Sequence, residues 1–136
     1  MIRINYGKMK KYCLDRYGIK TLEAEYLGDG VLGRFFPAGV ILICPVECEK
    51  DSCYGKQREV LVFLHEMCHY FKYLEHIGNY GKKDEEACFE FEVICNEVLN
   101  NGNDGKDFET VKRLGLERSM EFLEEVKRYC REREVL

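Results

Sequence analysis

The decisive stretch of this chain runs REVLVFLHEMCHYFKYLEH from Arg58 to His76. Apolar side chains recur along it at three- and four-residue spacing. This repeat predicts an amphipathic helix over 58–76 whose apolar stripe faces a core. His65 and His69 are four residues apart, so both imidazoles are expected on one face of that helix, about one turn apart. The stripe consists of Leu61, Leu64, Met67, Cys68 and Phe71.

Two imidazoles at this separation can bind one zinc ion, at Zn–N distances of roughly 2.0–2.1 Å. Glu66 follows the first histidine and is suited to act on a metal-bound water, first as general base and then as general acid. Two of the three histidines of the chain lie in this motif. The pattern therefore indicates a site for one Zn²⁺ per chain. The alternative is a helix whose two histidines are partly exposed and have no function.

A catalytic zinc site needs a third protein ligand and one open position. The next predicted helix, 84–99, carries Glu85, Glu86 and Ala87 in its first turn. We expect Glu86 to be the third ligand, because the small side chain of Ala87 lets the two helices approach closely; Glu85 and Glu90 remain alternatives. Glu90, one turn further on, is expected to accept the remote N–H of a ligand histidine.

A hydrogen-bond donor for the developing oxyanion is also expected in such a site. His76 and Tyr80 lie in the predicted loop between the motif helix and Glu86. These two residues are the candidates for that role.

The run from Arg34 to Leu99 resembles the ImmA/IrrE family of metallopeptidases. The resemblance rests on a glycine-bearing hairpin, an apolar strand, Gln57-Arg58 leading into the motif helix, and then Glu-Glu-Ala-x-x-x-Phe. The motif followed by a helix with Glu-Ala is also similar to the gluzincin arrangement. Cys68 stands where the family commonly has Gly, and Cys88 where Asn often follows Glu-Ala. The resemblance implies Glu86 as third ligand, and substrates that are often regulatory proteins such as transcriptional repressors.

The remaining pattern predicts a single α+β domain over residues 1–136. It comprises an N-terminal helix, a small three-stranded antiparallel sheet, and then three helices that include the HExxH helix. Gly28-Asp29-Gly30 is typical of a tight turn between the first two strands. The third strand, Val40–Cys44, is expected to offer an edge to an extended peptide substrate. The other predicted ranges are a helix over 6–17, strands over 21–27 and 31–36, a loop over 46–55, and a last helix over 107–131.

Composition argues against two kinds of partner. The net charge is −4 and no basic cluster compensates for it, so a nucleic-acid partner is not expected. The longest apolar runs, Val40–Cys44 and Val60–Leu64, are too short to span a bilayer. No targeting segment is visible at the N-terminus, so a cytoplasmic protein is expected.

Seven of the eight cysteines fall into two groups, and the eighth, Cys68, lies within the HExxH motif. Four of them lie at helical positions and are expected to be small buried apolar side chains: Cys13, Cys88, Cys95 and Cys130. Cys44, Cys48 and Cys53 bracket a polar loop instead. Free thiols, one disulfide and a second metal site all remain open for these three.

Three functions follow as hypotheses. The first is a zinc-dependent endopeptidase that acts on a peptide or protein, including a transcriptional regulator as the resemblance implies. The second is a catalytically silent, zinc-stabilised regulatory or binding module, and the third is a metal-dependent hydrolase of another substrate. Glu66 favours an enzyme, because a purely structural site normally closes its fourth position with a protein ligand.

Overall fold

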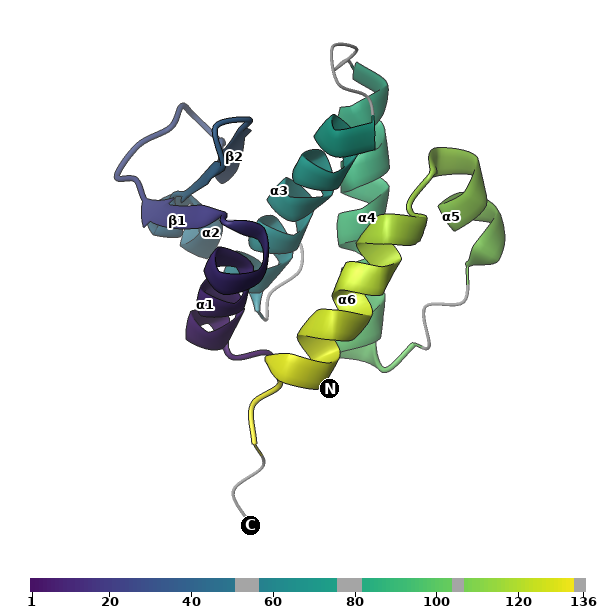
Figure 1. Cartoon of the computed structure of the whole chain (residues 1–136). Coiled ribbons are helices and arrows are strands. Elements are labelled where there is room, and N and C mark those ends of the chain that lie inside the picture. The colour runs from purple at the N-terminus through teal and green to yellow at the C-terminus, as the bar shows by residue number, and fades with distance from the viewer. Residues whose placement is uncertain (51–56, 76–81, 104–106, 134–136) are drawn as a thin grey trace.

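The computed structural model describes residues 1–50, 57–75, 82–103 and 107–133. It is an α+β structure, as predicted, with a small three-stranded sheet at one side of the helices. Figure 1 shows the sheet with α1 and α2 on one side of α3, and α4, α5 and α6 on the other. In chain order the elements are α1 (Tyr6–Tyr17), β1 (Lys20–Glu23), β2 (Gly33–Phe36), β3 (Val40–Ile43), α2 (Pro45–Lys50), α3 (Arg58–Glu75), α4 (Lys82–Asn101), α5 (Phe108–Leu114) and α6 (Glu117–Tyr129).

The sheet is mixed, so the prediction of an antiparallel sheet is wrong. Its strand order is β1-β3-β2, with β3 parallel to β1 and antiparallel to β2. The strands on either side of Gly28-Asp29-Gly30 therefore lie on opposite edges and do not form a hairpin. Ile41 and Ile43 of β3 are fully buried. Burial of these apolar side chains favours the central position for β3, where both of its neighbours shield it from water.

β1 and β2 are the two edge strands of the sheet, and β3 lies between them. Among the described residues β2 pairs with β3 alone, whereas β3 is paired on both sides. The expectation that Val40–Cys44 offers an edge to a substrate is therefore wrong. At the start of β2, a Cβ on Gly33 would lie 2.9 Å from Val62 Cγ1. The missing side chain allows β2 to pack directly on α3.

The single C-terminal helix predicted over 107–131 is two helices. α5 ends at Gly115, whose φ of 63° suits glycine and whose N–H bonds back to Lys112 O. The buried ammonium of Lys72 on α3 donates hydrogen bonds to the carbonyls of Leu114 and Gly115. The break is thus anchored to the centre of the molecule. The predicted loop over 46–55 begins instead as helix α2, which ends at Lys50.

All seven cysteines in the described ranges are buried, and no disulfide joins any two of them. The helical cysteines are therefore small core side chains, as predicted. Cys53 lies outside the described residues. Whether it forms a disulfide or a shared metal site with Cys44 or Cys48 therefore stays an open alternative. Within the described ranges, no helix has the length and apolar character that a membrane span requires.

Candidate metal centre

α3 carries both histidines of the motif on one face. His65 and His69 are 9% and 6% exposed, and their Nε2 atoms lie 3.2 Å apart. Glu66, 6% exposed, is buried beside them. The predicted pairing of the two imidazoles is therefore confirmed, and it follows from helix geometry alone.

Glu85 completes the cluster, in place of the expected Glu86. Its Oε1 lies 3.0 Å from His65 Nε2 and its Oε2 lies 2.9 Å from His69 Nε2. Glu85 and Glu86 are both exposed, so exposure does not distinguish them; the residues whose donor atoms come together are His65, His69 and Glu85. The physical reason is the rotation of α4. Successive helical residues are about 100° apart, and the burial of Ala87 and Cys88 against the core turns Glu85 toward α3.

A second carboxylate reaches the far side of His65, and it is Glu92 rather than the expected Glu90. Glu92 Oε1 lies 3.8 Å from His65 Nδ1, and Glu92 Oε2 lies 3.5 Å from Arg58 Nη1. Glu90 is only half-buried. The spacing of seven residues between Glu85 and Glu92, two helical turns, is the sequence signal that could have identified Glu92.

Burial and charge perturb the acid–base groups of the cluster. Burial lowers the pKa of His65, but the hydrogen bond to Glu85 and the charges of Glu66 and Glu92 outweigh it, so the pKa is raised. Burial raises the pKa of Glu66, although the two histidines oppose this. Hydrogen bonds from both imidazoles hold the pKa of Glu85 well below its usual range. Three carboxylates around two imidazoles thus create a field that favours a cation.

The three donor groups fit a divalent metal ion. The Nε2 atoms of His65 and His69 lie 3.2 Å apart, and each lies 2.9 to 3.0 Å from a different oxygen of the Glu85 carboxylate. Ligands at roughly 2.0–2.1 Å in tetrahedral geometry would be separated by roughly 3.3 Å. Two imidazole nitrogens and one carboxylate oxygen are also a donor set of catalytic zinc sites, where a fourth position stays open.

The cluster opens into a cleft of about 560 Å³ between β2, α3 and α4. Residues 30–36 line one wall, and Glu85, Phe89 and Glu92 of α4 line the other. Their spacing of four and three residues places these three side chains on one face of α4. Phe89 is 51% exposed, which leaves an aromatic surface open to the cleft.

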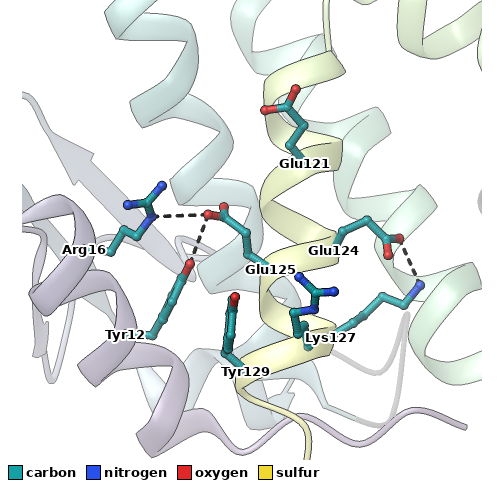
Figure 2. A pocket seen from close by; sticks show the side chains of 8 residues that line it. Tyr12, Arg16, Glu121, Glu124, Glu125, Lys127 and Tyr129 are labelled. Carbon is teal, nitrogen blue, oxygen red and sulfur yellow. Dashed lines mark hydrogen bonds and ion pairs between the residues drawn. The ribbon is translucent and has the colours of Figure 1, made fainter.

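A larger hollow, about 890 Å³, lies between α1 and α6. Figure 2 shows Tyr12 and Arg16 pointing from α1 toward Glu125 on α6. Tyr12 Oη donates to Glu125 Oε1 at 3.0 Å, and Arg16 Nε lies 3.4 Å from the same oxygen. These polar groups pair with one another across the hollow, whereas the smaller cleft holds His65, His69 and Glu85.

His76 and Tyr80 lie outside the described residues, so the assignment of an oxyanion donor stays a prediction. No family model matches the chain, and neither a curated protein nor a solved structure matches it. The resemblance to ImmA/IrrE metallopeptidases therefore also stays a prediction.

Proposed function

We propose that this protein is a zinc-dependent endopeptidase. The observation that carries the proposal is the convergence of His65, His69 and Glu85 on one point at the base of an open cleft, with the carboxyl group of Glu66 buried beside them. When bound there, zinc supplies a water of lowered pKa and polarises the scissile carbonyl.

The side chains of the chain divide the remaining work. His65, His69 and Glu85 would hold the ion, and three protein ligands would leave a position open for water. Glu66 takes the proton of that water and later delivers it to the leaving amine. Burial raises the pKa of Glu66, which strengthens it as a base near neutral pH.

The unpaired edge of β2 supports a peptide as substrate. An extended peptide can add to such an edge through backbone hydrogen bonds, and residues 30–36 line the same cleft as the metal-binding residues. A carbonyl of the added strand would then lie in the cleft that holds His65, His69 and Glu85. This edge favours a peptidase over a hydrolase of a smaller, non-peptide substrate. Two further parts of the proposal rest on the sequence alone. These are a transcriptional regulator as substrate and a cytoplasmic location.

The alternative function is a zinc-stabilised module without turnover. Burying a carboxyl group such as Glu66 costs free energy, and a site that only binds a structural metal ion does not need that group. A structural site would also be expected to fill its fourth position with a protein ligand. Both points favour the enzyme.

The test combines metal content with peptide cleavage. Zinc per chain is measured by elemental analysis on the wild type and on Glu85→Gln, Glu86→Gln and Glu66→Gln, each confirmed to be folded. We expect about one zinc in the wild type, Glu86→Gln and Glu66→Gln, and a reduced content in Glu85→Gln.

Cleavage is then followed on a mixture of unstructured peptides by mass spectrometry. Zinc-dependent cleavage that is lost in Glu66→Gln supports the peptidase. A folded wild type that contains no zinc and binds none when zinc is added would exclude the zinc enzyme. Zinc binding without cleavage of any peptide, including those derived from transcriptional regulators, favours the silent module.

A further inference from the structure

We propose that Arg58 is a positioning residue of the metal centre, which holds Glu92 in place as acceptor for the Nδ1–H of His65 and is itself held by Gln57. The proposal rests on the proposed function, since it concerns the same metal site. It connects that site with the N-terminal segment of the chain, far from it in sequence.

The contacts of His65 indicate which of its two ring nitrogens carries the proton. Its Nε2 faces His69 and Glu85, so Nε2 is the atom available to a metal. A neutral imidazole that binds through Nε2 carries its proton on Nδ1. Within the described residues Nδ1 makes no hydrogen bond, and Glu92 Oε1 lies 3.8 Å from it. A small rotation of either side chain would complete that bond.

Glu92 is held by an ion pair with Arg58. The side chains of Arg58 and Glu92 are 9% and 6% exposed, and Arg58 Nη1 lies 3.5 Å from Glu92 Oε2. A guanidinium stays charged at every accessible pH, so it balances the buried carboxylate permanently. With one oxygen facing Arg58, the other is directed toward His65. A ligand histidine oriented in this way binds metal more tightly.

Arg58 is held in turn by the residue before it, Gln57. Gln57 precedes it at the start of α3 with a φ of 59°, in the left-handed region that residues other than glycine rarely adopt. The Gln57 side chain accepts a hydrogen bond from Ile4 N at 2.7 Å and donates to Ile2 O at 3.0 Å and to Asn100 Oδ1 at 2.9 Å.

Strained backbone of this kind persists only where its surroundings fix it. Here the surroundings are the N-terminal segment and the end of α4. The orientation of Arg58, and through it of His65, therefore depends on residues 2–4.

The test measures zinc affinity by competition with a chelator, and the visible absorption spectrum after Co²⁺ replaces zinc. The variants are Arg58→Met, Arg58→Lys, Glu92→Gln and Gln57→Gly. Arg118→Met is the matched control, because Arg118 also pairs with a glutamate, Glu125, at 3.5 Å but lies outside the cleft. We expect Arg58→Met and Glu92→Gln to weaken zinc binding roughly 10- to 100-fold and to shift the cobalt bands.

Arg58→Lys keeps the positive charge and should recover part of the zinc affinity that Arg58→Met loses. Gln57→Gly should weaken zinc binding. The control Arg118→Met should change neither the zinc affinity nor the cobalt spectrum. Equal zinc affinity and identical cobalt spectra in the wild type and folded Glu92→Gln or Arg58→Met would overturn this proposal and leave the proposed function intact. If Arg58→Met does not fold, Glu92→Gln and Gln57→Gly decide the matter by the same criteria. A wild type that binds no zinc would overturn both proposals.

Discussion

Gly33 and Val62 approach so closely that a Cβ on the glycine would lie 2.9 Å from Val62 Cγ1, and 3.1 Å from both Ile43 Cδ1 and Leu42 O. Val62 lies one helical turn before His65 on α3. This contact therefore fixes the unpaired edge of β2 beside the candidate metal centre.

The Gly33–Val62 contact predicts that Gly33→Ala destabilises the fold. The added methyl group meets a buried side chain and a backbone carbonyl, so we expect a loss of about 1–3 kcal/mol in the free energy of unfolding, measured with urea. Val62→Ala in the same chain should recover part of that loss, because the two sites are in contact. The control is Gly7→Ala in α1, where the nearest atom is 3.4 Å away and φ is not positive. That change should be neutral or stabilising. A neutral Gly33→Ala would show that β2 can move away from α3.

Lys72 predicts a second loss of stability. Lys72→Met keeps most of the side-chain volume but removes the donors to the carbonyls of Leu114 and Gly115. Buried carbonyls without donors cost about 1–3 kcal/mol, which urea unfolding would detect. Lys50→Met is the control, because Lys50 pairs with Glu47 at an exposed site and should contribute little. Similar unfolding curves for the two variants would contradict the anchoring role of Lys72.

Glu125 predicts an acid-dependent part of the stability. Burial raises its pKa, but hydrogen bonds from Tyr17 and Tyr12 and the charge of Arg118 outweigh this, so the pKa is lowered in the folded state. A lowered pKa contributes stability that is present above the unfolded value, roughly 4.3, and is lost as the pH falls through the folded value. The difference in unfolding free energy between wild type and Glu125→Gln should therefore be largest at neutral pH and shrink in acid. A difference that does not change with pH would contradict this account. Glu124→Gln, at an exposed position of the same helix, is the control.

Metal removal should lower the melting temperature of the zinc-loaded protein, because an ion that binds only the folded state stabilises it by mass action. At a free zinc concentration of about 100 times Kd, the contribution is about 2.7 kcal/mol. Glu85→Gln should lose most of the zinc-dependent shift in a thermal melt, whereas Glu86→Gln should keep it. The reverse order would restore Glu86 as third ligand.

The sequence was sufficient for features set by local geometry. The repeat along 58–75 predicts α3, and a four-residue spacing brings two imidazoles together on any helix. The placement of Glu66 beside them follows for the same reason. The order of the predicted elements was likewise enough to indicate an α+β fold, and the helical positions of four cysteines were enough to predict their burial.

Only the tertiary structure decided the choices that depend on packing between elements. Glu85 and Glu92 face the candidate metal centre, instead of Glu86 and Glu90, because the burial of Ala87 and Cys88 sets the rotation of α4 against α3. The central position of β3 depends on burying Ile41 and Ile43, and it makes β2 the edge strand at the cleft. Each of these choices is a comparison among arrangements with nearly equal local preference. Burial of apolar surface between distant segments decides among them, and that quantity exists only once the chain is folded.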